Sequence, residues 1–288
     1  METPLLALER NGMIPLGAAY TINTYSYTSQ YSALACIRHL SDMGFTSFEM
    51  MLIPGHFWPS LATAAERKQI ATLLAERGLQ LETLNQPNLD INLAALSPEC
   101  RDYSCAVVSS AMELAAEWNA RAVVVNPGKT NPVFPAGAQV LADRFRSSLD
   151  ILVPRAAELG VRLIVKNHPL SWLYKGADLL AFFDEYGWAN IGLAYDVANA
   201  AYGRESVLHT LPSIAEHLSA VYVADTPLEE FRHDEVGAGV VQFTPISAAL
   251  ATIGYKGPTI IEVVSPDPDR AISQSVSELE RLGWPSPA

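Results

Sequence analysis

Short apolar runs of strand length recur eight times along this chain, and a segment of helical periodicity follows each run. Strands that alternate with helices form parallel sheets, because each return to the start of the sheet needs a crossover connection. Eight such units close into a (β/α)8 TIM barrel, which we predict here. The predicted strands span 14–20, 46–50, 79–84, 122–126, 161–166, 191–196, 220–225 and 259–264, and the predicted helices span 31–43, 62–77, 98–119, 138–159, 177–186, 206–217, 245–253 and 269–282.

Glycines mark the joints of this alternation. Each stands between a predicted helix and the next strand, where a left-handed helix end favours glycine. No Pro/Gly/Ser-rich linker divides the chain, and its 288 residues suit one barrel. We therefore predict that residues 1–288 form a single TIM-barrel domain. These glycines are Gly44, Gly78, Gly160, Gly187 and Gly254.

The charge balance argues against a protein that binds nucleic acid. The formal net charge is -12 and the sequence pI is about 4.9, whereas neutralising phosphates needs clustered Lys and Arg. Three cysteines are too few and too irregular for a disulfide framework. No window holds the roughly 20 apolar residues of a membrane span, and the first residues lack the pattern of a signal peptide. We expect a cytoplasmic protein that binds a small molecule, and neither nucleic acid nor membrane.

Several predicted strands end in polar residues that can do chemistry. The run 160–169 is apolar until Lys166, Asn167 and His168. In a TIM barrel the C-terminal ends of the strands carry the active site, so these side chains should meet at the barrel mouth. The other residues of this kind are Glu49, Asp196 and Glu262.

Short sequence blocks around these strand ends resemble a known family. The blocks are Leu84-Asn85-Gln86-Pro87, Val123-Val124-Val125-Asn126-Pro127-Gly128, Leu193-Ala194-Tyr195-Asp196, Val236-Gly237-Ala238-Gly239 and Ile260-Ile261-Glu262-Val263. Their order and spacing resemble the sugar phosphate isomerase/epimerase group of xylose-isomerase-like barrels, across nearly the whole chain. The resemblance implies a TIM-barrel enzyme of sugar chemistry, but the fold alone does not choose the reaction.

The resemblance also implies a divalent metal site, from which this chain departs. In that family strands five to eight supply glutamate, aspartate, histidine and glutamate to the ion. The matching positions here are Lys166, Asp196, Tyr222 and Glu262, so two of the four ligands are replaced. An ammonium in place of a carboxylate changes the site by two charge units and repels a dication. We therefore expect no cofactor.

Our leading hypothesis is that the Lys166 ammonium takes the electrostatic place of the metal between Asp196 and Glu262. The two carboxylates would keep the lysine protonated. Such a cation could stabilise an enediolate while Glu262 moves a proton, which makes Glu262, Lys166 and Asp196 the predicted catalytic residues.

Two alternatives for the same site stay open. Lys166 could lose its proton and attack a sugar carbonyl as a free amine. Alternatively, a divalent ion (Mn2+, Mg2+ or Zn2+) could still bind through a different set of ligands. The candidate metal ligands are Asp196, Asp225, His233 and Glu262, with His168 as a further donor.

The polar and aromatic residues after the strands predict a sugar or a cyclic polyol as ligand, because such rings stack on aromatic faces and hydrogen-bond at their edges. No glycine-rich phosphate loop is present. The predicted substrate-binding residues are Glu49, His56, Asn85, Asn167, His168, Tyr222, Arg232 and His233. The aromatic side chains expected around the mouth are Tyr20, Tyr25, Tyr27, His56, Phe57, Trp58, Trp172 and Tyr174.

Three functions are compatible with these residues. The leading prediction is an isomerase or epimerase that abstracts a proton next to the carbonyl of a sugar or polyol. A lyase, either a keto-polyol dehydratase or a deglycosidase, would begin with the same proton abstraction. A non-catalytic sugar-binding protein with a degenerate metal site is the third. A homo-oligomer is compatible with each of them.

Overall fold

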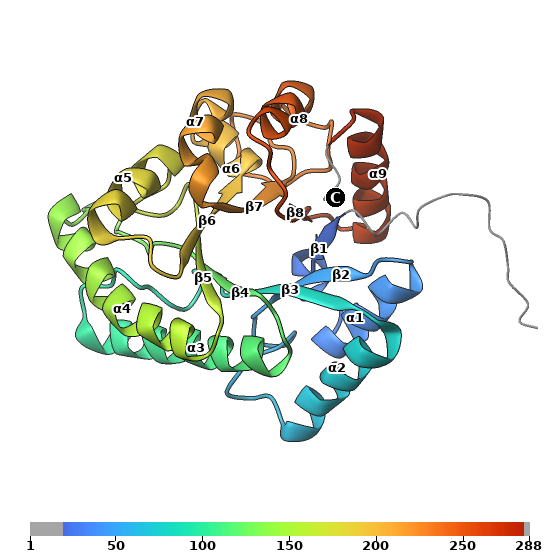
Figure 1. The fold of residues 1–288 in the computed structure, drawn as a ribbon, viewed down its shortest axis with the longest axis horizontal. Coiled ribbons are helices and arrows are strands. Elements are labelled where there is room, and N and C mark those ends of the chain that lie inside the picture. Colours follow the sequence, from blue (N-terminus) through green and yellow to red (C-terminus); the bar gives the residue numbers. More distant parts are fainter. Residues whose placement is uncertain (1–19, 285–288) are drawn as a thin grey trace, which may run out of the picture.

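The computed structural model describes residues 20–284, which form a closed barrel of eight parallel strands. The predicted (β/α)8 barrel is therefore confirmed. Figure 1 shows the helices as a ring outside the strands. The strands are β1 (Thr21–Asn23), β2 (Ser47–Met51), β3 (Gln80–Asn85), β4 (Ala122–Val125), β5 (Arg162–Lys166), β6 (Ile191–Asp196), β7 (Leu218–Val223) and β8 (Thr259–Ile261).

The helices follow the predicted order, with one addition. The short helix α6 begins directly after β6, where the Asp196 carboxylate accepts a hydrogen bond from the Asn199 backbone N–H and caps the first turn. The helices are α1 (Ala33–Asp42), α2 (Ala64–Arg77), α3 (Pro98–Glu117), α4 (Ala138–Glu158), α5 (Gly176–Tyr186), α6 (Val197–Tyr202), α7 (Val207–Ile214), α8 (Phe243–Thr252) and α9 (Pro268–Arg281). None of the helices between residues 20 and 284 is long and apolar enough to cross a membrane.

The first strand lies later in the chain than predicted. We expected it at 14–20, but β1 pairs with its neighbours through Thr21, Ile22 and Asn23. Residues 14–19 lie outside the described part of the chain. The apolar run around Ile14 therefore misled the prediction, and the polar residues that follow it form the strand itself.

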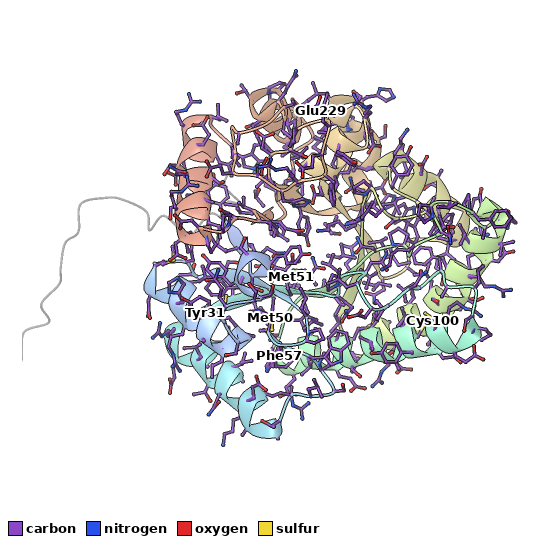
Figure 2. All side chains as sticks on the ribbon, turned by 180° about the vertical axis from the view of Figure 1, so that it is seen from behind. Tyr31, Met50, Met51, Phe57, Cys100 and Glu229 are labelled. Carbon is purple, nitrogen blue, oxygen red and sulfur yellow. The ribbon has the colours of Figure 1, made fainter. Side chains whose placement is uncertain are left out.

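Two apolar layers hold the barrel together. Side chains alternate along each strand, so that Val123 and Val125 face the helices while Ala122 and Val124 face the barrel axis. The larger layer fills the space between strands and helices, as the side chains in Figure 2 show. The smaller one closes the barrel interior and consists of Ala122, Val124, Ile164, Ala194, Ala220, Tyr222 and Ile260. The candidate site lies directly above this interior layer.

Candidate active site

The acidic and basic side chains of the site stand one step above the interior apolar layer. Residues two apart on a strand point to the same side of the sheet. A residue two positions after a member of the interior apolar layer therefore also points toward the barrel axis. Three residues converge at the C-terminal end of the barrel for this reason. The pairs are Ile164 with Lys166, Ala194 with Asp196, and Ile260 with Glu262.

The Lys166 ammonium lies at the centre of this group. Its Nζ is 2.6 Å from Glu262 Oε2 and 3.8 Å from Asp196 Oδ2. It also lies 4.2 Å from the centre of the Tyr222 ring, within range of a cation–π interaction. The lysine is only 3% exposed. One buried cation is thus held by two carboxylates and an aromatic face.

The surroundings of Lys166 favour its charged form. Burial by itself lowers the pKa of this lysine, but the carboxylates of Glu262, Asp196 and Glu49 act in the opposite direction and prevail. The net pKa of Lys166 is therefore above its ordinary value. A free amine that attacks a carbonyl needs the reverse shift, so this environment opposes the covalent alternative.

Asp196 is the least satisfied member of the group. Its Oδ1 accepts the Asn199 backbone N–H at 2.9 Å, whereas Oδ2 is buried and has no hydrogen-bond partner within residues 20–284. Burial raises the pKa of Asp196, and the charges of His233 and Lys166 oppose that rise. The Asp196 carboxylate is therefore costly to keep charged and depends on the two neighbouring cationic side chains.

His233 closes the group from the loop after β7. Its Nδ1 is 3.0 Å from the Glu262 backbone carbonyl and its Nε2 is 3.1 Å from Asn199 Oδ1. The Asn199 amide is oriented by its own Nδ2, which donates to the Asn167 carbonyl at 2.9 Å. Both ring nitrogens of His233 thus contact oxygen atoms of the protein, which fixes the orientation of the ring.

A second carboxylate cluster lies deeper in the barrel, around Glu49. Its Oε1 accepts from Asn23 Nδ2 at 2.5 Å and from Asn85 Nδ2 at 3.1 Å. Its Oε2 accepts from the hydroxyls of Thr83 and Tyr222, each at 2.5 Å. Burial raises the pKa of Glu49, and Lys166 opposes that shift. Glu49 is thus a fully hydrogen-bonded anchor that joins four strands.

A cavity of about 330 Å³ opens above the Lys166 group. This volume is at the lower end of the roughly 300–1,000 Å³ range of ligand pockets and suits a single sugar ring. Glu262 brings its carboxylate to the cavity, whereas Lys166 lies beneath it. The lining residues are Tyr25, His168, Phe231, Arg232, His233, Asp234, Glu262 and Val264.

His168 presents a fixed tautomer to this cavity. The backbone N–H of Leu170 donates to its Nδ1 at 3.2 Å, so the proton of the neutral ring sits on Nε2. Burial, with the charges of Lys166, His233 and Lys129, lowers the pKa of His168 to about 3. His168 is therefore a neutral hydrogen-bond donor at the cavity wall throughout the physiological pH range.

Asn167 and His56, which were predicted to bind substrate, form hydrogen bonds within the protein instead. The amide of Asn167 accepts from the Asp196 backbone N–H at 2.7 Å and donates to its carbonyl at 3.1 Å. The ring of His56 contacts the Tyr31 carbonyl at 2.8 Å and the Thr24 hydroxyl at 3.1 Å. In both cases protein groups already occupy the polar atoms, which fixes the ends of neighbouring strands.

Arg232 and Asp225 both lie in the loop after β7, but they have different surroundings. Arg232 lines the cavity and is paired with Asp234 at 2.8 Å. Asp225 is buried, and its carboxylate accepts the backbone N–H groups of Gly237 at 3.0 Å and Val241 at 2.9 Å. Asp225 therefore shapes the loop that carries Arg232 and His233.

The aromatic residues predicted around the mouth divide into two groups. Tyr25 lines the cavity. Phe57 packs edge-on against Trp118 with ring centres 5.2 Å apart, and Trp172 packs against Phe145 at 6.3 Å. Phe57 and Trp172 thus pack against other aromatic rings of the protein.

Several residues of the two clusters and the cavity were missed in the sequence, among them Asn23, Thr83 and Phe231. Asn23 contacts Glu49 and also lies 3.3 Å from Glu262 Oε2, so that it links the two clusters. Thr83 contacts Glu49, and Phe231 lines the cavity between His168 and His233. Asn23 has the same strand-end signal as the others, but the first strand was placed too early for it to be recognised.

The sequence of residues 37–282 matches the family model of the xylose isomerase-like TIM barrel. The chain belongs to this family. Over 146 residues it is 27% identical to a ketose 3-epimerase of Arthrobacter globiformis, a match that covers 48% of each protein. It is also 25% identical over 184 residues to an uncharacterized protein of Methanocaldococcus jannaschii, covering 62% of this chain and 63% of that one. The chain thus matches less than two thirds of either relative.

Several solved structures share this fold at low sequence identity. A D-tagatose 3-epimerase-like protein superposes with a TM-score of 0.79 at 18% identity, covering 92% of this chain and 98% of the other. The 3-keto-D-glucoside 4-epimerase of E. coli gives 0.76 at 18% identity, with 91% and 99% covered. An L-ribulose 3-epimerase gives 0.77 at 17% identity, with 92% and 94% covered.

The metal site implied by this family fits the present residues poorly. Asp196, His233 and Glu262 offer ligand atoms within 4.8 Å of one another. However, the ammonium 2.6 Å from Glu262 would stand beside a dication. Both His233 nitrogens also already contact protein oxygens, at 3.0 and 3.1 Å, so an ion would have to displace one of these contacts. In the described structure it is the Lys166 ammonium that lies beside these two carboxylates.

Proposed function

We propose that this protein is a sugar or polyol isomerase or epimerase that abstracts a proton next to a carbonyl group. The observation that carries the proposal is the Glu262 carboxylate, which is 5% exposed, lines a cavity of sugar size and is ion-paired with a buried lysine. The ketose 3-epimerase among its relatives supports the same chemistry.

Glu262 is the base in this proposal. It takes the proton from the carbon next to the carbonyl, the electron pair of that C–H bond forms a C=C bond, the π pair of the C=O bond moves onto oxygen, and an enediolate results. Return of the proton from the protonated Glu262 to the neighbouring carbon gives the isomer, whereas epimerisation needs a second proton donor on the opposite face of the carbon that lost its proton. A carboxylate in this position typically contributes about 10²–10⁴-fold to the rate.

Lys166 is an electrostatic positioning residue rather than a direct contact. Its ammonium lies beneath the cavity, 2.6 Å from Glu262 Oε2, and orients that carboxylate. Its charge also favours the negative charge that develops on the substrate above it. A preorganised charge in a buried site is effective because water does not screen it.

The cavity wall supplies the donors for the substrate oxygens. His168 and Tyr25 both line the cavity and can donate through the Nε2–H and the hydroxyl, and both groups are neutral because burial lowers the pKa of the imidazole and raises that of the phenol. A neutral imidazole can polarise a carbonyl without delivering a full proton to it. Arg232 adds a charged donor at the rim.

The substitution Glu262→Gln tests the base. It keeps the shape and removes proton transfer, so we expect kcat to fall about 10³-fold while the Kd for a bound ketose changes by less than threefold. Turnover is followed by the entry of solvent deuterium at the carbon next to the carbonyl. Glu82→Gln is the matched control, because Glu82 is also buried but pairs with Arg121 outside this site.

Three comparisons in the same assay separate the alternatives. A panel of ketoses, inososes and glycosides distinguishes isomerisation from elimination by its products. Ligand binding without turnover, unchanged in Glu262→Gln, would identify a non-catalytic sugar-binding protein. Treatment with a chelator should change turnover by less than twofold if Lys166 replaces the ion, whereas a loss that Mn2+ restores would contradict that role.

A further inference from the structure

A second cavity lies beside the site cavity. Its volume is about 380 Å³, again the size of a small ligand group. Arg232, Asp234 and Val264 line both cavities, so the two spaces meet along these side chains. The remaining lining residues of the second cavity are Pro227, Glu235, Ala238, Ser265, Pro266, Arg270 and Ala271.

Two arginine–carboxylate pairs stand in the wall of this second cavity. Arg232 donates to Asp234 Oδ1 from Nη2 at 2.8 Å and from Nε at 3.0 Å. Arg270 Nη1 lies 3.0 Å from Glu235 Oε2. Each pair exposes N–H donors next to carboxylate acceptors, a combination that matches neighbouring hydroxyl groups, each of which is both donor and acceptor.

The net charge and the apolar residues of the second cavity indicate which class of ligand it can bind. Two arginines and two carboxylates cancel, so the cavity has no excess positive charge for a phosphate. Val264, Ala238 and Ala271 are small apolar residues that leave room for the C–H face of a ring. An uncharged polyhydroxyl group fits both properties.

We propose that this second cavity is a subsite for the second ring of a disaccharide or glycoside, whose reacting ring occupies the site cavity above Glu262. The assignment rests on the proposed function for the identity of the reacting ring. It names the substrate class as a sugar that carries a further uncharged ring, in preference to a free monosaccharide or a sugar phosphate.

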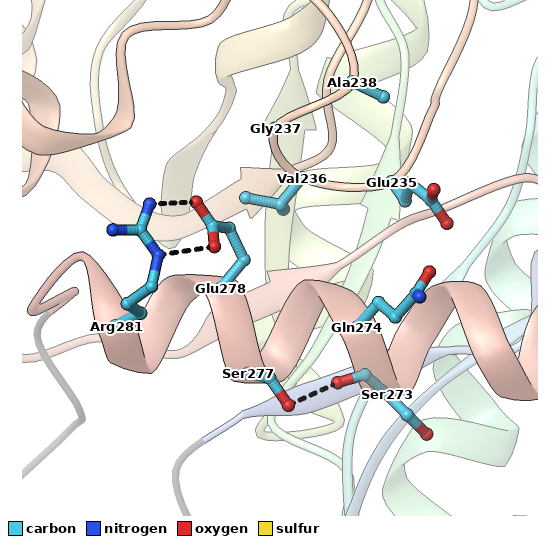
Figure 3. Close-up of a pocket in the computed structure, with 9 residues that line it drawn as sticks. All are labelled: Glu235, Val236, Gly237, Ala238, Ser273, Gln274, Ser277, Glu278 and Arg281. Atoms are coloured by element: carbon cyan, nitrogen blue, oxygen red, sulfur yellow. Dashed lines mark hydrogen bonds and ion pairs between the residues drawn. The ribbon is translucent and has the colours of Figure 1, made fainter.

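A third cavity provides a natural comparison. It lies between α9 and the segment Glu235–Ala238, as Figure 3 shows, and it shares Glu235 and Ala238 with the second cavity. Its described lining has no residue in common with the site cavity. Arg281 in this third cavity is paired with Glu278 at 2.5 Å, much as Arg270 is paired with Glu235. Arg281 is therefore a matched arginine on the same helix that lies outside the proposed subsite.

Binding of four sugars tests the subsite directly. The Kd values of D-fructose, isomaltulose, lactulose and fructose 6-phosphate are measured by calorimetry on the full chain. In isomaltulose and lactulose a second ring is attached to fructose through O6 and O4. We expect at least one disaccharide to bind 10-fold or more tightly than D-fructose, and fructose 6-phosphate to have no such advantage. Equal Kd values for fructose and both disaccharides, or tightest binding of the phosphate, would overturn the subsite.

Two substitutions locate the effect. Arg270→Met removes the donors at similar length, and Ala238→Trp fills the cavity from an exposed loop position. Each should reduce the ratio of fructose to disaccharide Kd from at least tenfold to below threefold, whereas Arg281→Met keeps the ratio. If both subsite variants keep the full ratio, the second ring binds elsewhere.

The test of the subsite can be distinguished from the test of the proposed reaction. Turnover of D-fructose, followed by solvent deuterium, reports on Glu262 and the site cavity alone. A disaccharide preference that is lost in Arg270→Met supports the subsite even if no sugar in the panel is turned over. Conversely, turnover of fructose without any disaccharide preference supports the reaction and rejects the subsite.

Discussion

The barrel contains two buried carboxylate clusters that differ in how their charge is satisfied. Glu49 lies in the deeper cluster, where four neutral donors from Asn23, Thr83, Asn85 and Tyr222 surround it. Every hydrogen bond to this carboxylate comes from an uncharged side chain that the strands hold in place. Both carboxylate oxygens already accept two hydrogen bonds from the protein, so they are not available to a ligand. These bonds connect β1, β2, β3 and β7.

The upper cluster has the opposite character. Glu262 and Asp196 have fewer neutral donors, one each from Asn23 and the Asn199 backbone, and both lie beside the charged Lys166. Asp196 Oδ2 has no hydrogen-bond partner in the described chain, and the Glu262 carboxylate reaches a cavity. Buried polar groups are normally satisfied, so an unsatisfied carboxylate oxygen beside a cavity is a candidate position for binding or catalysis.

The two clusters are physically joined through Tyr222. Its hydroxyl donates to Glu49, and its ring lies under the ammonium of Lys166. The lower cluster therefore fixes the face on which the upper cation rests. We therefore expect substitutions in the Glu49 cluster to reduce mainly stability, and substitutions in the Lys166 cluster to reduce mainly turnover.

Lys166→Met should have the largest effect because it reduces both stability and turnover. It leaves Glu262 and Asp196 buried without their cation, so we expect the free energy of unfolding to fall by about 3–5 kcal/mol. Turnover should fall about 10²-fold, since the preorganised charge is lost. Urea unfolding and steady-state kinetics measure the two effects.

Lys175→Met is the control for this substitution. Lys175 also lies over an aromatic ring, 5.3 Å from the centre of Tyr174, but no buried carboxylate pair surrounds it in the described structure. It should change stability by less than 1 kcal/mol. Wild-type stability and turnover in Lys166→Met would show that the upper cluster does not depend on its cation.

Glu49→Met should have the next largest effect, and mainly on stability. The substitution leaves four buried donors without an acceptor, so the free energy of unfolding should fall by about 4 kcal/mol. Glu49→Gln keeps an acceptor oxygen and should cost about 1–2 kcal/mol. We expect kcat of either variant to fall by less than 10-fold, as measured on the folded protein below its unfolding transition.

A larger loss of turnover than of stability in Glu49→Met would break the distinction between the clusters. It would mean that the Tyr222 ring needs its hydrogen bond to Glu49 in order to hold Lys166 for catalysis. Tyr222→Phe, which keeps the ring and removes the hydroxyl, would then reproduce the loss of turnover.

Much of the upper cluster could be predicted from the sequence because local rules decide it. The period of strands and helices determines a barrel, and alternation along a strand determines which side chains face inward. Lys166 and Asp196 end apolar strands and Glu262 directly follows one, so their convergence follows from the fold alone.

The contacts that depend on loops and on the first strand could not be predicted in this way. Asn23 was missed because an apolar run around Ile14 drew the strand prediction toward the N-terminus. The contacts of His233 with Asn199 and with the Glu262 carbonyl depend on the course of the loop after β7. That course is set by Asp225, whose carboxylate holds distant backbone N–H groups that no local pattern reveals.

The smallest predicted effect concerns pH and His168. The folded pKa of this histidine is lowered to about 3, chiefly by burial, from an ordinary value near 6.5. The unfolded chain therefore takes up a proton below about pH 6.5 that the folded chain refuses, and stability is lost as the pH falls. At pH 5 this difference amounts to about 2 kcal/mol.

His168→Gln should remove this pH dependence. The variant has nothing to titrate at position 168, so between pH 7 and pH 5 it should lose about 2 kcal/mol less unfolding free energy than the wild type in urea titrations. His209→Gln, at an exposed position on α7, should respond to pH like the wild type. An equal loss in wild type and His168→Gln would mean that the imidazole becomes charged in the folded state. The mouth would then present a third cation to the substrate, and the neutral donor proposed for the carbonyl would have to be replaced by a proton donor.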